Sequence, residues 1–312
     1  MCAALLASCS AAPAPAPTQG PALAPSEIIA AAPGADWAPI APSELLVMDL
    51  APDAKGAARR VVIQLLPAPF SQGWIGNIRA LAAAKWWDGT SVNRVQDGYV
   101  VQWGDPDGED KAKAKALPAG LKVMPAEDYA ATAGSPEVKA FLDKSRGGTI
   151  AGLSKDAYAE SVEFRSGWPL GSDAKAMWPI HCYGTVGVGR DYPPDTGSGA
   201  ELYAVIGQAP RQLDRNIAVV GRVIEGMEHL ASLPRGTGDI GFYKTAQERT
   251  PILSIRIGSD VPGLPRYEYL STESKSFAAY ADARANRRDS FYIRPAGGVD
   301  ICNVPVPVRR VP

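Results

Sequence analysis

The chain has 312 residues, of which 46% are hydrophobic, enough for one large domain or two small ones with a real core. Its net charge of −1 gives no basic excess, which argues against a nucleic-acid partner. The sequence holds only two histidines, His181 and His229, and no HExxH or CxxC motif, so a zinc site or a His-based triad has few candidate residues.

The chain begins with an apolar stretch, MCAALLASC, which ends in Leu6-Ala7-Ser8-Cys9. Small residues before such a cysteine resemble the lipobox of bacterial lipoproteins. The resemblance implies a signal peptide at 1–9, lipidation of Cys9 and a periplasmic, lipid-anchored protein. The stretch carries no Lys or Arg, which signal peptides usually have, so an ordinary N-terminus rich in small residues is the alternative. No run of 18 apolar residues follows, so we expect membrane attachment through the lipid alone.

Residues 10–42 are dominated by Ala and Pro. This composition favours extended chain and buries little, which is typical of a linker. We therefore expect a tether that leads to a folded domain beginning near residue 43.

The first part of that domain alternates strand and helix patterns. Glu44–Leu50 and Arg60–Leu66 are short runs rich in Val, Ile and Leu, and they predict a hairpin. Gln72–Trp87 has apolar residues at helical spacing. Gly98–Trp103 again reads as a strand.

Residues 107–175 have a different character, because charged residues and Ala dominate them. Ser135-Pro136 before Glu137–Lys144 is a typical helix start, with a capping Ser and Pro at the first helical position. We expect an insertion with one or two short helices.

Strand patterns return after the insertion. The runs are Met177–Cys182, Gly184–Val188, Leu202–Ile206, Ile217–Ile224 and Ile252–Ile257. Several short strands with few helices predict a barrel or a sandwich. A C-terminal extension, 259–312, is expected to pack on it, with a helix at Phe277–Arg288 and a Val/Pro arm at Asp300–Pro312 that Pro confines to a sheet edge or a cover.

Two cysteines, Cys182 and Cys302, lie in the body of the chain. In an oxidising compartment they can form one disulfide. The alternative is two separate buried thiols, since free cysteine packs like a small apolar residue.

Two ordered blocks of motifs resemble one family. The first block consists of Asn77–Ala82, Trp86–Val95 and Asp97–Pro106, and the second of Gly184–Val186, Ser198–Val205, Leu213-Asp214 and Val220–Met227. They resemble the cyclophilin series NFxxL, YYDGTxFHRV, PGFMxQGGDP, GTVxMA, NGSQFFI and LDGxHxVFGxVxEGM. The resemblance spans about Leu45–Ile257 and implies a cyclophilin-like domain at 43–258. The implied fold is mainly β, a closed eight-stranded antiparallel barrel capped by two helices.

The resemblance also implies peptidyl-prolyl isomerisation. Amide resonance opposes rotation about an X-Pro bond, and a hydrogen bond to the prolyl nitrogen weakens that resonance. Binding the twisted peptide more tightly than either planar form lowers the barrier further. Neither a cofactor nor a metal is expected. In this family pattern Arg94 is the catalytic guanidinium and Gln102 binds the substrate backbone.

The expected substrate-binding residues surround that pair. They are Tyr99, Val100, Tyr203 and Leu213 in an apolar and aromatic wall, with Glu201 and Arg190 at the rim. Several rim positions depart from the family: Glu201 stands for a glutamine, Asn93 for a histidine, Gln212 for a tryptophan and Ile217 for another histidine. Glu201 either orients Arg94 through a bidentate pair or holds it away from substrate.

These departures leave more than one function open. The first is an isomerase whose partners are proline-containing peptides and unfolded exported proteins. The second is a proline-peptide-binding or scaffold module of the cell envelope with little turnover. The third is a structural envelope protein in which the insertion or the C-terminal arm carries the function.

Overall fold

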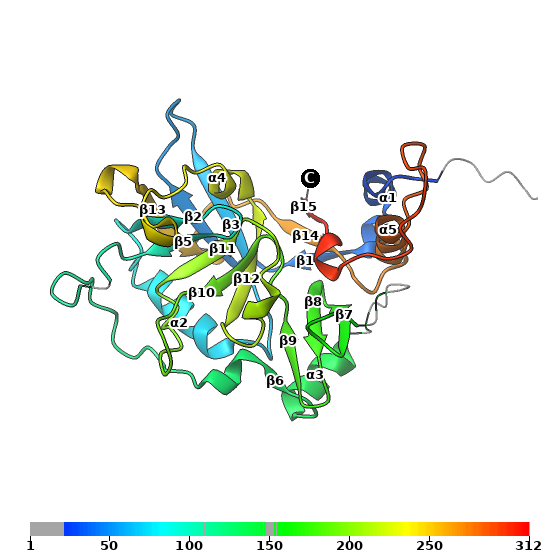
Figure 1. Cartoon of the computed structure of the whole chain (residues 1–312), viewed down its shortest axis with the longest axis horizontal. Helices are drawn as coiled ribbons and strands as arrows, with labels where there is room; N and C mark the ends of the chain where they lie inside the picture. Colours follow the sequence, from blue (N-terminus) through cyan, green and yellow to red (C-terminus); the bar gives the residue numbers. More distant parts are fainter. Residues whose placement is uncertain (1–21, 109, 146, 148–152, 154, 312) are drawn as a thin grey trace, which may run out of the picture.

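Figure 1 shows the computed structural model, which describes residues 22–108, 110–145, 147, 153 and 155–311. Eight strands close into an antiparallel barrel in the order β10-β11-β5-β4-β13-β2-β3-β12. Their bounds are β2 Leu45–Leu50, β3 Arg59–Leu65, β4 Ser91–Val95, β5 Val100–Gly104, β10 Thr185–Val188, β11 Leu202–Val205, β12 Val219–Glu225 and β13 Thr250–Ile257. The predicted fold class is confirmed, and β4 is the one barrel strand that the strand patterns did not single out.

The alternation of side chains in β2 and β3 explains how the barrel is filled and covered. Leu46, Met48 and Ile63 point into the main core, as do the corresponding residues of the other strands. Leu45 and Val62 point outward and pack in a separate cluster with Tyr267 of the C-terminal extension. Because both faces of these strands are buried, they read as continuous apolar runs.

Two helices belong to the barrel, α2 (Gln72–Ala83) and α4 (Met227–Ala231). Helix α2 buries Trp74, Ile78 and Leu81 in the main core, which is the apolar face that the sequence predicts. It ends at Ala83, earlier than expected, because the chain turns at Lys85, whose φ is +53°.

The insertion contains the expected helix and also an unexpected sheet. Helix α3 (Pro136–Lys144) begins at Ser135, whose hydroxyl accepts a hydrogen bond from the Val138 amide at 3.2 Å. The sheet has the order β6-β9-β8-β7. Its strands are β6 Ala131–Thr132, β7 Ser161–Arg165, β8 Trp168–Ser172 and β9 Ala176–Pro179. The sequence predicted one or two short helices in 107–175 but no sheet. The two-residue turn Ser166-Gly167, with both φ values positive, is the hairpin signal for β7–β8.

The assignment of all of 10–42 to a linker is wrong. Helix α1 (Pro25–Ala31) contacts α5 (Lys275–Ala285), and β1 (Trp37–Ile40) pairs with β14 (Tyr267–Leu270). Strand β14 also pairs with β15 (Val308–Arg310), which is an edge strand as the Val/Pro pattern predicts. The composition of the segment could not show this, because its few apolar residues find their partners more than 200 positions away in the chain.

These terminal segments and the insertion enclose what we call the second core. It includes Trp37, Phe164, Trp178, Leu270, Phe277, Tyr280 and Ile301. The second core lies beside the barrel, on the side of α1 and α5 in Figure 1. The C-terminal extension thus packs mainly on the other added segments and, through Tyr267, on the barrel.

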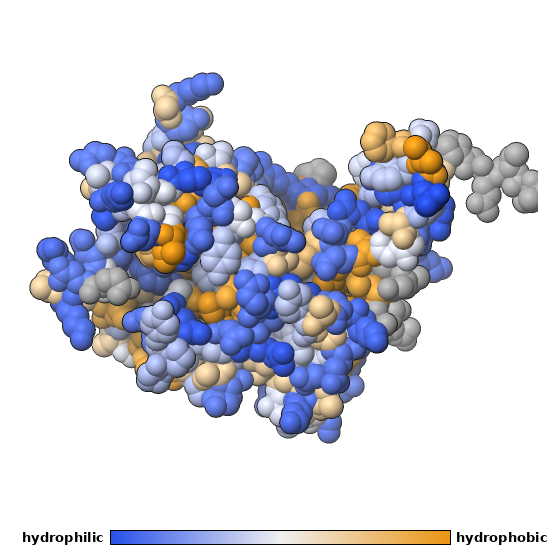
Figure 2. Space-filling model, in the orientation of Figure 1, coloured by the Kyte–Doolittle hydropathy of each residue, from blue (hydrophilic) through white to orange (hydrophobic). Residues whose placement is uncertain are grey.

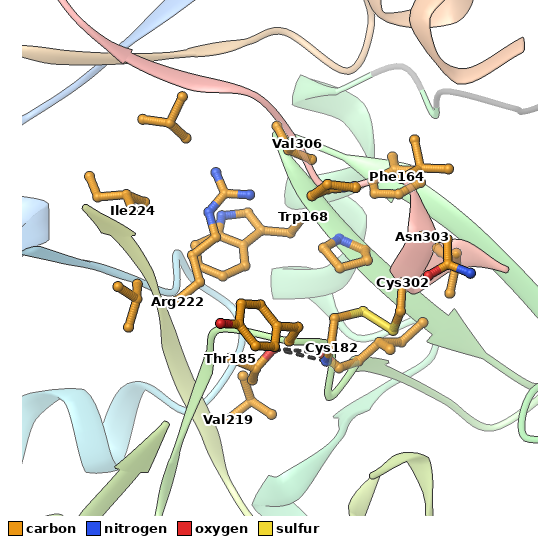
Figure 3. A pocket seen from close by; sticks show the side chains of 18 of the residues that line it. Phe164, Trp168, Cys182, Thr185, Val219, Arg222, Ile224, Cys302, Asn303 and Val306 are labelled. Carbon is orange, nitrogen blue, oxygen red and sulfur yellow. Dashed lines mark hydrogen bonds between the residues drawn. A yellow bond between two sulfur atoms is a disulfide. The ribbon is translucent and has the colours of Figure 1, made fainter. Parts of the chain in front are cut away.

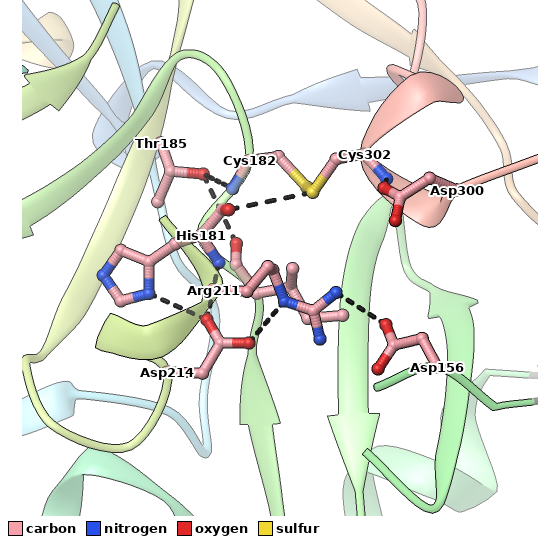
Figure 4. Close-up of a disulfide and its surroundings, with 9 residues drawn as sticks. Asp156, His181, Cys182, Thr185, Arg211, Asp214, Asp300 and Cys302 are labelled. Carbon is pink, nitrogen blue, oxygen red and sulfur yellow. Dashed lines mark hydrogen bonds and ion pairs between the residues drawn. A yellow bond between two sulfur atoms is a disulfide. The ribbon is translucent and has the colours of Figure 1, made fainter. Parts of the chain in front are cut away.

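Cys182 and Cys302 are joined by a disulfide with an S–S distance of 2.05 Å. The bond links the segment after β9 to the C-terminal arm, which we define as residues 301–311 (Figure 4). Of the two alternatives for these cysteines, the structure therefore has the disulfide. Among the described residues, no helix combines the length and the apolar character needed to cross a bilayer.

Candidate active site

Three neighbouring strands bring the central candidate residues into one row. Arg94 on β4 is the register partner of Gln102 on β5, and Gln102 is the partner of Tyr203 on β11. The residues that alternate with them, such as Val101 and Leu202, belong to the main core. The row therefore faces outward from the barrel.

Side-chain and backbone acceptors hold the guanidinium of Arg94. Nε donates to the Ile240 carbonyl at 2.8 Å, and Nη1 donates to Gln102 Oε1 at 3.2 Å. Nη2 donates to Gln96 Oε1 in a short contact. These bonds use one N–H on each nitrogen, and each Nη carries a second N–H that can be offered to a ligand.

Aromatic rings flank the same guanidinium. Its carbon lies 5.8 Å from the ring centre of Tyr99 and 5.4 Å from that of Phe242, within the range of a cation–π interaction. Burial lowers the pKa of Arg94, and Tyr99 acts in the opposite direction. The ordinary pKa of an arginine is so high that the side chain stays protonated near neutral pH even when burial lowers it.

The contribution of residues 239–242 was not predicted. This segment follows α4 and crosses beside β4, where Phe242 forms an isolated bridge with Arg94. Ile240 and Phe242 are 61% and 40% exposed, so two large apolar side chains stand in solvent next to the guanidinium. In the sequence, the only indication that this loop reaches the site is the pair of apolar residues on either side of Gly241.

The expected apolar wall is assembled beside Arg94. Val100 and Tyr203 are buried in one cluster, and Tyr99 and Leu213 pack against them. Ile217, which replaces a family histidine, joins the same cluster. All four wall residues predicted from the sequence therefore lie together.

A buried polar chain behind the wall was also missed. The Tyr203 hydroxyl lies 2.9 Å from His181 Nε2, and His181 Nδ1 lies 2.9 Å from Asp214 Oδ1. Arg211 donates to Asp214 Oδ2 and to Asp156 Oδ2, both at 2.6 Å (Figure 4). The Asp214 carboxylate accepts a hydrogen bond from His181 Nδ1, and in this tautomer His181 Nε2 accepts a hydrogen bond from the Tyr203 hydroxyl.

The two rim residues, Glu201 and Arg190, are bonded to neighbouring loops. Glu201 Oε1 accepts a hydrogen bond from the Asp105 amide at 2.7 Å. The guanidinium of Arg94 is oriented by the glutamine side chains at 96 and 102. Arg190 donates from Nε and Nη2 to the Asn216 carbonyl at 3.2 and 3.0 Å, which ties the rim to the loop before β12. The candidate lipidation residue Cys9 lies outside the described residues.

The family model described as cyclophilin type peptidyl-prolyl cis-trans isomerase/CLD matches residues 60–257. The match covers more than half of the chain. This chain belongs to the cyclophilin family. The family prediction is confirmed, and the members of the family are peptidyl-prolyl cis-trans isomerases.

The fold of this cyclophilin is similar to the crystal structure of cyclophilin AquaCyp293 from Hirschia baltica. The TM-score is 0.63 and the identity 19%, over 88% of this chain and 92% of the other. A cyclophilin type peptidyl-prolyl cis-trans isomerase from Cryptosporidium parvum aligns with a TM-score of 0.37 and 14% identity, over 68% of this chain and 97% of that one. The same protein in the presence of the dipeptide Ala-Pro gives a TM-score of 0.36, 14% identity, and coverage of 68% and 98%. No curated protein matches the sequence.

The described residues contain no group of three or more His, Cys, Asp or Glu side chains placed to hold a metal ion.

Proposed function

We propose that this cyclophilin isomerises X-Pro bonds on the face formed by Arg94, Gln102 and the apolar wall. One observation carries the proposal: the Arg94 guanidinium is held by Gln102 and Gln96 against the Tyr99 ring of the wall, with a second N–H on each Nη. A cation fixed next to an apolar wall suits a prolyl ring whose nitrogen needs a hydrogen-bond donor.

The reaction needs no bond other than the rotating one to change. As the X-Pro bond twists, the prolyl nitrogen becomes pyramidal and gains a lone pair that Arg94 can bind by an Nη–H. Gln102 accepts from Arg94 through Oε1, so its amide N–H groups are the ones available to a substrate carbonyl. Fixed donors at the site where charge develops lower the barrier without reorganisation.

Arg94→Ala is the decisive variant in a protease-coupled assay on an Ala-Pro peptide. Because removal of a fixed donor costs about 10²–10³ in rate in other enzymes, we expect a loss of this order in kcat/KM. Arg60→Ala is the matched control, since Arg60 lies on β3 and pairs with Asp49, and it should keep the wild-type rate. Equal rates of wild type and Arg94→Ala at background level would refute the isomerase, and equal rates well above background would refute the role of Arg94.

The second function is a proline-peptide holder on the same face. It is favoured by the Ile240 carbonyl, which occupies Arg94 Nε, and by Ile217 in the wall, where the family has a histidine. Background turnover by the wild type together with saturable binding of the Ala-Pro peptide, lost in Arg94→Ala, would establish the holder in place of the isomerase.

We also propose that the clients are exported proteins and that the protein is lipid-anchored in the periplasm. The lipobox-like N-terminus and the Cys182–Cys302 disulfide support this location, since structural disulfides persist in oxidising compartments. Mass spectrometry of the protein from its native host should give an N-terminal peptide that begins at a lipid-modified Cys9. A peptide that retains Met1, with an unmodified Cys9, would contradict the anchor.

A further inference from the structure

A cleft of about 370 Å³ lies between the barrel and the segments that enclose the second core. One wall is β12, another is the hairpin β7–β8, and the C-terminal arm forms the third (Figure 3). Figure 2 shows apolar surface, in orange, at this junction. The volume is at the lower end of the range for small-molecule sites.

Arg222 is the charged group that β12 contributes to this cleft. Its Nε and Nη2 donate to Gln64 Oε1 at 3.0 and 2.7 Å, and its Nη1 donates to the Gly167 carbonyl at 2.6 Å. The guanidinium carbon lies 4.5 Å from the ring centre of Trp168. Figure 3 shows the two side chains next to each other. All of these partners are neutral, so they orient the cation without compensating its charge.

The surroundings do not supply the missing charge. The described residues that line the cleft include a second arginine, Arg284, and no Asp or Glu. Loss of hydration lowers the pKa of Arg222 to about 10, with Tyr269 acting in the opposite direction. Other arginines stacked on tryptophan in this chain do have a carboxylate: Arg215 on Trp178 pairs with Asp173 at 3.3 Å.

We propose that this cleft binds a small carboxylate with an apolar tail, with the carboxylate on Arg222 and the tail along Trp168 and the C-terminal arm. A bound anion would compensate a cation that is otherwise held in apolar surroundings at a cost. Beyond the bonds to Gln64 and Gly167, Nη1 and Nη2 of Arg222 each have a second N–H, and a charged guanidinium N–H is a strong donor to a carboxylate. The site is separate from the Arg94 face and does not depend on its activity.

The lining favours a hydrocarbon tail over a peptide. Apart from the two arginines, its side-chain polar groups are few, namely Thr185, Asn303, the Tyr183 hydroxyl and the Trp168 indole N–H. The amide groups of a bound peptide would lose their water and find few partners there, which is unfavourable. A fatty-acid-like monocarboxylate has only one polar end to satisfy.

Isothermal titration of the full chain with decanoate tests the proposal. We expect saturable one-to-one binding with a Kd below about 1 mM, and a rise in Tm with decanoate concentration. Decanol has the same tail without the charge, and acetate has the charge without the tail, so each should bind at least about 10-fold more weakly. Equal binding of decanol and decanoate, or no saturable binding of decanoate, would overturn the proposal.

Arg222→Gln tests whether decanoate binding depends on the charge of Arg222, with the Tm as a check that the variant is folded. The variant keeps hydrogen-bonding groups and removes the uncompensated cation, so we expect an unchanged or higher Tm without ligand and about 10- to 100-fold weaker decanoate binding. Arg215→Gln removes another guanidinium stacked on a tryptophan, outside the cleft, and should bind decanoate like the wild type. Wild-type affinity in Arg222→Gln, or tighter binding of a short peptide with a free C-terminal leucine than of decanoate, would refute the assignment.

Discussion

The hydroxyl of Tyr203 fixes the position of this ring in the wall of the candidate active site. The hydroxyl lies against Gly187, where an added Cβ would collide with it, and it hydrogen-bonds to the buried His181. Burial raises the pKa of Tyr203 well above its ordinary value, and the nearby Tyr99 and Asp214 act in the same direction. The ring is thus fixed from behind while its face remains part of the wall.

The raised pKa of Tyr203 predicts a loss of stability in alkali. Below about pH 10 the phenol is neutral in the folded and in the unfolded chain, so it adds no pH dependence. Above that pH the unfolded chain releases the proton first, so stability falls by up to about 1.4 kcal/mol per pH unit for this one group. Urea denaturation of Tyr203→Phe between about pH 9 and 11 should show a shallower decline than the wild type.

The exposed Tyr183 provides the control for that experiment. Tyr183→Phe should decline with pH as the wild type does, because its side chain is 53% exposed. At neutral pH, Tyr203→Phe should itself be less stable by about 1–3 kcal/mol, since His181 Nε2 loses its donor. Identical alkaline slopes in the wild type and Tyr203→Phe would contradict this account of the buried phenol.

The residues that could be predicted are those inside the ordered motifs. Arg94, Gln102 and the wall residues follow from motif spacing and lie together in the structure. His181 and the Ile240 carbonyl were out of reach, because their contacts join positions 22 and 146 residues apart through loops. No local pattern encodes where such loops return to the barrel.

At the scale of elements, alternation and turn signals predicted the barrel strands well. They failed for the hairpin β7–β8 and for α1 and β1, and the reason is the same in both cases. Each of these elements is short and buries only a few apolar residues, in the second core or, for β8, in the main core, so their sequences look polar or linker-like. Their stability depends on distant partners more than on local propensity.

The N-terminal elements give a sharp test of that conclusion. A chain that starts at Ser43 lacks α1 and β1, so Trp37 leaves the second core and β14 loses one paired neighbour. Burial of one such side chain contributes about 1.5–3 kcal/mol. We expect the barrel to stay folded, and trypsin to cleave the C-terminal residues, at Arg284 and Arg309 among others, at least about 10-fold faster than in the full chain.

A chain that starts at Leu23 is the matched control for the truncation. It keeps α1 and β1 and should resist trypsin like the full chain, with the fragments identified by mass spectrometry. If both shortened chains proved equally resistant, residues 25–40 would be a linker after all.

At the scale of the whole molecule, the family match and the fold divide the chain differently. The match covers residues 60–257, which exclude β2 and the first residue of β3 and include the other barrel strands. The second core combines three segments that are far apart in the chain, around α1 and β1, around β7 to β9, and from β14 to the C-terminal arm. The cleft with Arg222 exists only because these segments are brought against β12.

The disulfide has a consequence for how the protein is made. Cys302 follows every barrel strand in the chain, and 120 positions separate it from Cys182. The bond can therefore close only after synthesis of the barrel is complete and the C-terminal arm has reached its place. A chain cut short before Cys302 would keep Cys182 as a thiol, open to mixed disulfides with folding catalysts in an oxidising compartment. Closure of this bond would thus mark full-length, assembled molecules during biogenesis.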